Sequence, residues 1–190
     1  PLLATRPRLT FGRDDAADVR ILEYVSTKTG CIVRLSIQGH GFDFPVPLFG
    51  VDQASNVAAA VAVALALGSR PAAIQAGLAG VAVPGGRCRV FMQSGRNLID
   101  DSYNANPASM FAAFETMAVL AGSNRRLAAL GSMFELGDDA AELHFQVGEK
   151  AGKSGIDEVF ALGPWAKELA AGAEAAGATG HVFAEINDLT

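Results

Sequence analysis

Residues 99–107 read IDDSYNANP and separate two apolar stretches that have different sequence rhythms. The segment gathers two carboxylates, a phenol, a hydroxyl and two amides within a chain that is 50% hydrophobic. Short alternating runs and alanine-rich helical runs precede it, whereas strands and helices alternate after it. The sequence therefore predicts an α/β protein with two parts that meet at this junction, and we place the domain boundary near Asn106.

Outward from the junction toward the N-terminus, residues 8–49 have the pattern of antiparallel strands. Apolar and polar residues alternate over residues 31–37, and a glycine-rich turn at residues 39–41 should carry His40 at its tip. The following run, residues 42–48, contains two prolines, which indicates an edge strand.

Two alanine-rich helices and a hairpin complete this half. The first helix is predicted over residues 56–67 with Asn56 as its N-cap, and the second over residues 70–80 with Pro71 in its first turn. Both are apolar nearly all round, which indicates burial against other elements. Short β-prone runs on either side of residues 94–96 predict a second hairpin.

The second half predicts repeated strand–helix units. A helix capped by Asn106 and Pro107 comes first. Strands then follow at residues 127–130, 158–162 and 181–184, and helices at residues 138–153 and 164–174. Short loops between such units indicate a parallel, Rossmann-like sheet.

Bulk composition excludes several classes of protein. The net charge of −5 argues against a nucleic-acid-binding surface. Cys31 and Cys88 fit neither a metal site nor a disulfide framework, which favours a reduced, cytoplasmic setting. The most apolar run, residues 57–67, is shorter than the roughly 20 residues that cross a bilayer, so we expect no membrane insertion. Because the chain begins at Pro1, we expect a piece of a longer protein.

Several conspicuous residues have ordinary structural interpretations. Residues 148–154, GEKAGKS, resemble a phosphate-binding loop, but only three residues separate the glycines and the run lies in a predicted helix. We therefore interpret it as a solvated helix end. His144 is expected to be a surface or packing residue, and Trp165 a core residue. Arg87 favours a lowered pKa for the neighbouring Cys88 thiol, but no partner base is apparent, so we regard Cys88 as structural.

The residue types in IDDSYNANP suit nucleotide recognition. A carboxylate can accept hydrogen bonds from the vicinal hydroxyls of a ribose. An aromatic ring can lie against a base, and amides can hydrogen-bond to its edge. Spacing alone leaves a second interpretation equally open, in which these residues only form turns and cap a helix at an interdomain hinge. Ligands often bind between domains, and this favours the nucleotide hypothesis.

Residues 100–107, with Ser109 and Met110 after them, resemble the signature of Mur ligases that add D-alanyl-D-alanine. The flanking segments are also similar, and the resemblance covers essentially all 190 residues. The similar flanks are Thr10-Phe11-Gly12, residues 82–87, and residues 130–137 with His144 and Gly148 spaced as expected after them.

The resemblance implies an ATP-dependent amide ligase of peptidoglycan precursor synthesis, and hence a role in cell-wall biogenesis, cell shape and cell division. In this family ATP phosphorylates the carboxylate of UDP-N-acetylmuramoyl-tripeptide, and the amine of D-alanyl-D-alanine attacks the acyl phosphate. By the same resemblance, residues 1–106 would form the later part of a central ATP-binding domain built from antiparallel hairpins and helices. Residues 107–190 would begin a C-terminal Rossmann-like domain.

The resemblance also implies positions for the nucleotide. Asp101 matches the carboxylate that holds the ATP ribose, and Tyr103 and Asn106 match its neighbours at the hinge. Arg87 matches a basic residue near the nucleotide, and Asn56 matches the second asparagine of an adenine-side motif. No catalytic residue and no metal ligand is assigned in this chain. The phosphate-binding loop and the magnesium ligands are expected upstream of Pro1, so we expect the chain alone to be inactive and its parent to be a monomer.

Three positions depart from the family pattern and keep alternatives open. Asp52 and Gln53 stand where the family has His and Asn, and Ser132 stands where it has Asp. One alternative is a sister Mur or folylpolyglutamate-type ligase that uses a different amino acid. The other is a non-catalytic, nucleotide-binding descendant.

Overall fold

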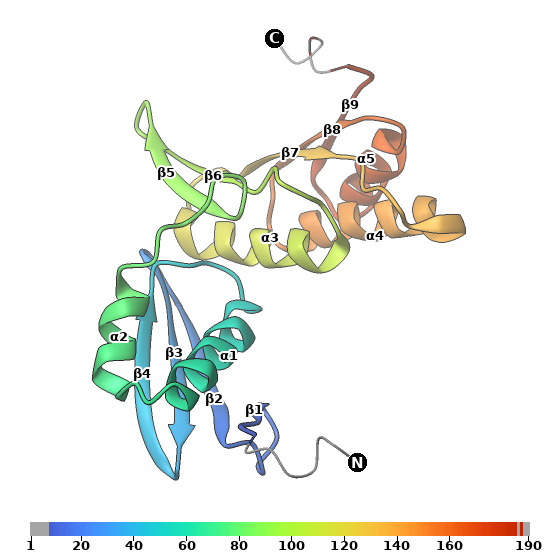
Figure 1. Ribbon diagram of the computed structural model, residues 1–190. Helices are drawn as coiled ribbons and strands as arrows, with labels where there is room; N and C mark the ends of the chain where they lie inside the picture. The colour runs from blue at the N-terminus through green and yellow to red at the C-terminus, as the bar shows by residue number, and fades with distance from the viewer. Residues whose placement is uncertain (1–7, 186, 188–190) are drawn as a thin grey trace. The chain divides into compact units, whose positions relative to one another are not determined.

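A four-stranded sheet forms the first part of the chain (Figure 1). The computed structural model describes residues 8–185 and 187. The strand order is β1-β2-β3-β4, in which β1 pairs parallel with β2 and the other pairs are antiparallel. The strands are β1 (Phe11–Gly12), β2 (Val19–Thr27), β3 (Gly30–Ile37) and β4 (His40–Val46). The proline-containing strand β4 therefore lies at the sheet edge, and this prediction is confirmed.

Helices α1 (Gln53–Ala66) and α2 (Pro71–Ala79) pack with this sheet. Alternate residues of β2, β3 and β4 are buried together with the apolar side of α1 and with Ile74 of α2. The buried strand residues are Val19, Ile21, Cys31, Val33, Leu35, Ile37, Phe44 and Val46. Burial of these side chains supplies the main favourable free energy of this unit.

Three local predictions for this unit need correction. Strand β2 was not singled out, because a bulge between Ile21 and Glu23 breaks its alternation. The turn consists of Gln38 and Gly39, both with positive φ, and His40 is already paired in β4. Helix α1 begins at Gln53, so Asn56 lies in its first turn instead of capping it.

The second part opens with the predicted hairpin, β5 (Arg89–Gln93) and β6 (Arg96–Asp100), which turns at Ser94 and Gly95. Helix α3 (Pro107–Ala121) follows. The Asn106 side chain accepts a hydrogen bond from the Ser109 amide at 2.9 Å, and the Ser109 hydroxyl accepts one from the Asn106 amide at 3.2 Å. This reciprocal pair is a capping box, so the predicted cap is confirmed.

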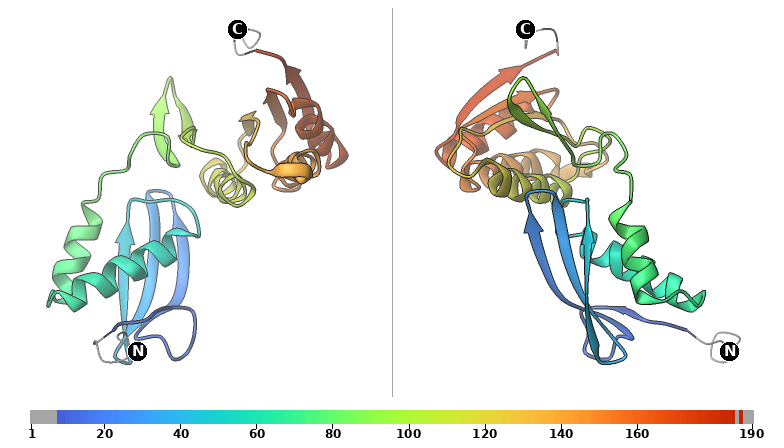
Figure 2. Two further views of the ribbon diagram at one scale, coloured as in Figure 1. Left: turned by 45° about the vertical axis from the view of Figure 1, so that its right-hand side comes forward. Right: turned by 90° about the vertical axis from the view of Figure 1, so that its left-hand side faces the viewer.

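A parallel three-stranded sheet follows, with the order β7-β8-β9, and it confirms the Rossmann-like prediction (Figures 1 and 2). Its strands are β7 (Leu127–Gly131), β8 (Glu158–Leu162) and β9 (Thr179–Phe183). The helices between them are η1 (Gly137–Asp139), α4 (Ala140–Lys153) and α5 (Ala166–Ala175). Residues of α3, α4 and α5 share one core with alternate residues of β7 and β8, including Leu130 and Val159.

Helices α4 and α5 cross at two glycines. A methyl group added at Gly148 would lie 2.0 Å from the Leu169 carbonyl oxygen, and one added at Gly172 would lie 2.0 Å from the Phe145 carbonyl oxygen. Only glycine permits this approach. Residues 148–153 thus belong to α4 and do not form a phosphate-binding loop, but the prediction of a solvated helix end is wrong for Gly148, which is buried against α5.

Contacts divide the chain into two compact units between Val83 and Pro84, N-terminal to the boundary that the sequence places near Asn106. The hairpin β5–β6 accounts for the difference, since it belongs with the second unit. One contact joins the residue before β5 to helix α3, since the Cys88 thiol lies 3.9 Å from the Thr116 hydroxyl. A domain hinge near Asn106 stays a prediction.

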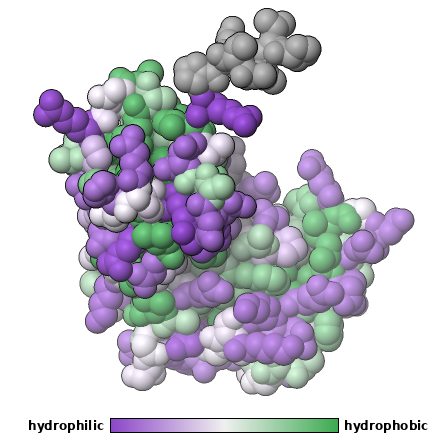
Figure 3. All heavy atoms as spheres, turned by 90° about the horizontal axis from the view of Figure 1, so that it is seen from below, coloured by the Kyte–Doolittle hydropathy of each residue, from purple (hydrophilic) through white to green (hydrophobic). Residues whose placement is uncertain are grey.

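The surface mixes hydrophilic and hydrophobic residues, as the face drawn in Figure 3 shows. The most exposed large apolar side chains include Leu67, Met92 and Phe134, which are 81%, 73% and 75% exposed. Among the helices that the structure describes, none is long and apolar enough to cross a membrane.

Candidate functional site

Asp100 fixes the backbone of the polar junction. Its Oδ1 accepts hydrogen bonds from the Ser102 hydroxyl at 2.6 Å and from the Ser102 amide at 3.2 Å. Its Oδ2 accepts one from the Gly86 amide at 3.1 Å. The Ser102 hydroxyl is the main cause of a lowered pKa for this carboxyl. Oδ1 therefore fixes the turn over residues 100–103, and Oδ2 ties this turn to Gly86.

Asp101 has a different environment. Its Oδ1 accepts a hydrogen bond from the Cys88 amide at 2.8 Å. Its Oδ2 has no hydrogen-bond partner within residues 8–185 and 187. Burial raises the pKa of the Asp101 carboxyl, and the nearby negative charge of Asp100 raises it further. Asp101 thus combines a fixed position with an oxygen that remains available to a ligand.

Arg87 and Tyr103 form the other side of this cluster. The guanidinium carbon of Arg87 lies 4.0 Å from the centroid of the Tyr103 ring, which is a cation–π contact. The Tyr103 amide donates to the Gly86 carbonyl oxygen at 2.9 Å. A side chain at Gly86, whose φ is +71°, would crowd the Tyr103 amide at 3.0 Å. Tyr103 nevertheless remains 68% exposed, so the ring is accessible.

The structure brings together three of the five predicted nucleotide residues, Arg87, Asp101 and Tyr103. Asn106 follows them in sequence, but its side chain is engaged in capping α3. No hydrogen bond that the structure describes joins it to the other three. Asn56 lies in the first unit, on the exposed side of α1, where its amide donates to the Gln53 side-chain oxygen at 3.2 Å.

Both thiols have raised pKa values. Burial raises the pKa of Cys88 to about 11, and it does the same for Cys31. Removal of the thiol from water is the main cause at Cys88, where the Thr116 hydroxyl opposes the rise in pKa and the Asp101 charge adds to it, so the lowering expected from Arg87 is not found. This agrees with a structural role for Cys88.

The raised pKa values predict slow alkylation of both cysteines in the folded chain. At pH 7.5 a pKa of about 11 leaves roughly one thiol in three thousand ionised, against roughly one in ten for an ordinary cysteine. Iodoacetamide labelling followed by mass spectrometry should be at least ~100-fold slower than for a cysteine peptide. Labelling in urea should be fast, and rapid labelling of folded Cys88 would contradict its assigned environment.

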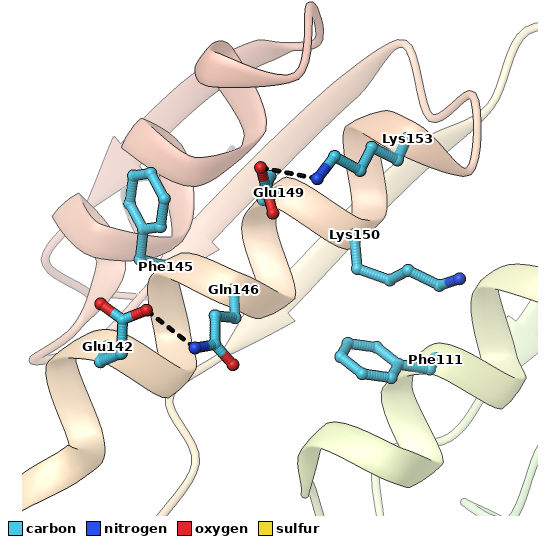
Figure 4. Close-up of a pocket in the computed structure, with 7 residues that line it drawn as sticks. All are labelled: Phe111, Glu142, Phe145, Gln146, Glu149, Lys150 and Lys153. Atoms are coloured by element: carbon cyan, nitrogen blue, oxygen red, sulfur yellow. Dashed lines mark hydrogen bonds and ion pairs between the residues drawn. The ribbon is translucent and has the colours of Figure 1, made fainter.

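A pocket of about 530 Å³ lies elsewhere, between α3 and α4 (Figure 4). Phe111 of α3 lines one side, and residues of α4 line the other. Its charged and polar groups are largely paired with each other, as in the Glu149–Lys153 ion pair and the Glu142–Gln146 hydrogen bond. This pocket is separate from the Asp101 cluster and offers few free groups to a ligand.

No metal ligand is assigned to this chain. Within the part of the chain that the structure describes, no group of three or more His, Cys, Asp or Glu side chains could hold a metal ion.

Sequence reasoning did not separate the roles of the two adjacent carboxylates. The signal was present, because an Asp two residues before a Ser is typical of a turn in which the side chain accepts from the later amide. It also did not predict that His144 is wholly buried. Ala140, His144, Val147 and Ala151 recur at helical spacing, which places His144 on the buried stripe of α4.

Comparisons with known proteins agree with this fold. Residues 86–190 match the family model described as Mur ligase, glutamate ligase domain. The UDP-N-acetylmuramoyl-tripeptide–D-alanyl-D-alanine ligase of Escherichia coli is 39% identical over 138 residues, 72% of this chain and 30% of that protein. The enzyme of the same name from Synechocystis is 42% identical over 137 residues, 70% of this chain and 30% of that protein.

A crystal structure of MurF from Acinetobacter baumannii superposes with a TM-score of 0.80 at 27% identity, and covers 95% of this chain and 39% of that one. This chain spans about 30% of the length of the two curated relatives. More than half of this chain, residues 86–190, is matched by the family model. The chain therefore belongs to the Mur ligase family.

Proposed function

We propose that this chain is part of an ATP-dependent ligase that joins D-alanyl-D-alanine to UDP-N-acetylmuramoyl-tripeptide, acting as a cytoplasmic monomer in peptidoglycan precursor synthesis. The observation that carries the proposal is the cluster of Arg87, Asp101 and Tyr103, held by the Asp100 turn. Support comes from relatives that bear this enzyme name at 39% and 42% identity. Because the matched length is about 30% of those relatives, the reaction is a proposal for the complete gene product that contains this chain.

The cluster fits a nucleotide. Asp101 offers Oδ2, and the spare lone pairs of Oδ1, to the two hydroxyls of a ribose. Arg87 supplies a fixed positive charge for phosphate oxygens, since its guanidinium is already ordered over the Tyr103 ring. The exposed Tyr103 ring suits contact with a base or ribose. When bound, ATP would supply the phosphoryl group that activates the acceptor carboxylate.

Asn56 and Asn106 complete the proposed nucleotide contacts in different ways. Asn56 carries an exposed amide, which can donate to and accept from an adenine edge. Asn106 has its side chain committed to the α3 cap, so we propose that it acts by fixing the start of α3 after the junction. A hinge near Asn106 would then move the Rossmann-like sheet without unwinding α3.

The proposal predicts which substrates stimulate phosphate release. The complete gene product, supplied with ATP and magnesium, should release phosphate rapidly only when UDP-N-acetylmuramoyl-tripeptide and D-alanyl-D-alanine are both present. We expect at least ~100-fold less release with L-alanine, D-glutamate, meso-diaminopimelate or a folate and glutamate, because a site built to hydrogen-bond one substrate leaves buried polar groups unpaired when an analogue binds.

The controls separate the alternatives. Full activity with one of the other amino acids would show that the protein is a sister ligase and would contradict D-alanyl-D-alanine as its substrate. Tight ATP binding without phosphate release under any substrate combination would instead support a non-catalytic nucleotide-binding protein.

A further inference from the structure

His144 joins two backbone groups in a buried hydrogen-bond chain outside the nucleotide cluster. Its side chain is 0% exposed. Its Nε2 accepts a hydrogen bond from the Met133 amide at 2.8 Å, and its Nδ1 lies 2.5 Å from the Ala140 carbonyl oxygen. The imidazole ring also stacks on Trp165, with 5.7 Å between ring centroids.

These partners fix the protonation of the ring. A backbone amide can only donate, so Nε2 must be unprotonated. A carbonyl oxygen can only accept, so Nδ1 must carry the proton. His144 is therefore a neutral imidazole with a defined tautomer, and it ties the loop residue Met133 to the first turn of α4.

Met133 belongs to residues 132–136, which join β7 to η1 and are called here the β7 loop (Figure 1). Ser132 fixes the start of this loop through two hydrogen bonds. Its hydroxyl accepts one from the Trp165 amide at 3.0 Å and donates one to the Leu162 carbonyl oxygen at 3.2 Å. Met133 points inward and is 2% exposed. Hydrogen bonds to neighbouring elements thus hold the loop at two successive residues, Ser132 and Met133.

The next two residues of the β7 loop have the opposite character. Phe134 is 75% exposed, although it is a large apolar side chain. Glu135 has a φ of +61°, a conformation that costs a non-glycine residue free energy and that persists where the surroundings enforce it. The loop follows the carboxyl end of a parallel strand, which is the edge where open α/β sheets bind ligands.

We infer that His144 is a positioning residue of the ligase, which sets the outward conformation of Phe134 and Glu135 by holding Met133 from inside the core. The inference rests on the proposed function, because the reaction that His144 would support is the proposed ligation. The β7 loop supplies none of the residues of the nucleotide cluster, Arg87, Asp101 and Tyr103, and the inference therefore assigns the loop to the tripeptide or the dipeptide. A displaced loop loses contacts with its substrate, which weakens binding and raises the KM, and a misplaced substrate also reacts more slowly.

Two substitutions separate the two hydrogen bonds of His144. In His144→Gln the amide oxygen reaches the place of Nε2 and can still accept from Met133. In His144→Asn the amide nitrogen reaches the place of Nδ1 and can still donate to Ala140, but the Met133 amide loses its acceptor. Both variants lose the imidazole ring, and glutamine keeps one methylene group that asparagine lacks, so exchange of the Met133 amide is the measurement that reports the hydrogen bond itself.

In the complete gene product we expect His144→Asn to raise the KM of the tripeptide or the dipeptide by about tenfold or more, with the KM of ATP unchanged. His144→Gln should restore most of the wild-type KM. In the 190-residue chain, the Met133 amide should exchange with solvent much faster in His144→Asn than in His144→Gln. Nitrogen chemical shifts of the wild-type ring should show a protonated Nδ1 and an unprotonated Nε2.

Equal KM values and equal Met133 exchange in the two variants would overturn the inference, as would a ring protonated at Nε2. A wild-type gene product that releases no phosphate when both substrates are present would count against the proposed function instead. The exchange of the Met133 amide would then decide by itself whether His144 holds the β7 loop.

Discussion

Replacing Gly148 by alanine should lower the free energy of unfolding of the second unit by about 3 kcal/mol. The new methyl group would lie 2.0 Å from the Leu169 carbonyl oxygen and 2.9 Å from the Ala173 amide nitrogen. Both are backbone atoms of α5, so no side-chain rotation can relieve the clash and the two helices must separate. Alanine is the better helix former by about 1 kcal/mol, which offsets only part of this cost.

Trp165 makes the measurement specific to the second unit. It is the chain's single tryptophan and lies at the start of α5, stacked on His144 of α4. Urea unfolding followed by its fluorescence therefore reports the α4–α5 packing. We expect the midpoint to fall markedly in Gly148→Ala and in Gly172→Ala, whose methyl group would meet the Phe145 carbonyl oxygen at 2.0 Å.

Gly77 provides a matched control. It lies inside helix α2, and a methyl group there would meet nothing within 4 Å. Gly77→Ala should leave the Trp165 transition unchanged and stabilise α2 by up to about 1 kcal/mol. A Gly148→Ala protein with a wild-type midpoint would show that the two helices are not packed as closely as described.

Replacing Asp101 by asparagine should lower kcat/KM for ATP by about 100-fold in the complete gene product. Asparagine can keep the hydrogen bond from the Cys88 amide through its oxygen. It exchanges the second carboxylate oxygen for an NH2 group, which cannot accept from a ribose hydroxyl, and it removes the charge that strengthens such bonds. The loss should appear with ATP and not in the KM of D-alanyl-D-alanine.

The same substitution should not destabilise the fold. Burial raises the pKa of Asp101, so the folded state disfavours its charged form. The resulting loss of stability is absent below the unfolded-state pKa, grows as pH rises through the raised folded-state pKa, and is complete above it. Asp101→Asn should therefore be at least as stable as the wild type at pH 7, with the difference shrinking in acid.

Asp100→Asn is the companion variant, because this carboxylate serves the turn. Its lowered pKa, caused mainly by the Ser102 hydroxyl, means that the charged form is favoured in the fold. Loss of charge at Asp100 should weaken the junction, and urea unfolding should show it. Opposite outcomes for the two neighbours would separate a structural carboxylate from a ligand-binding one, whereas equal loss of stability would contradict this division.

Much of the fold could be predicted from the sequence, because regular periodicity reports local structure. The helix at Asn106 and Pro107 and strand β8 were predicted closely, since a strong cap and a short apolar run mark them. Strand β2 lies within the predicted strand region, residues 8–49, but its bounds were not predicted, because a bulge shifts the buried face between Ile21 and Glu23 and no local pattern shows such a shift. The start of α1 was misplaced because Asp52 and Asn56 are equally good capping residues, and the turn after Gly50, whose φ is +101°, starts the helix at the earlier one.

The candidate site could be predicted only as a set of residue types. Sequence reasoning selected Arg87 and Tyr103 by resemblance, but their stacking depends on the link between Gly86 and Tyr103, which are far apart in the chain. The sequence gives no spacing rule for such a non-local pair. The same limit applies to His144, whose partner Met133 belongs to a different element.

The most direct test of the proposed function is to identify the product. The complete gene product would be incubated with ATP, magnesium, UDP-N-acetylmuramoyl-tripeptide and D-alanyl-D-alanine, beside its Asp101→Asn variant, and the mixture examined by mass spectrometry. We predict the UDP-linked pentapeptide from the wild type, and roughly 100-fold slower formation by the variant at limiting ATP. A folded, ATP-binding wild type that forms no pentapeptide would contradict the proposed reaction, and a variant as fast as the wild type would contradict the role of Asp101.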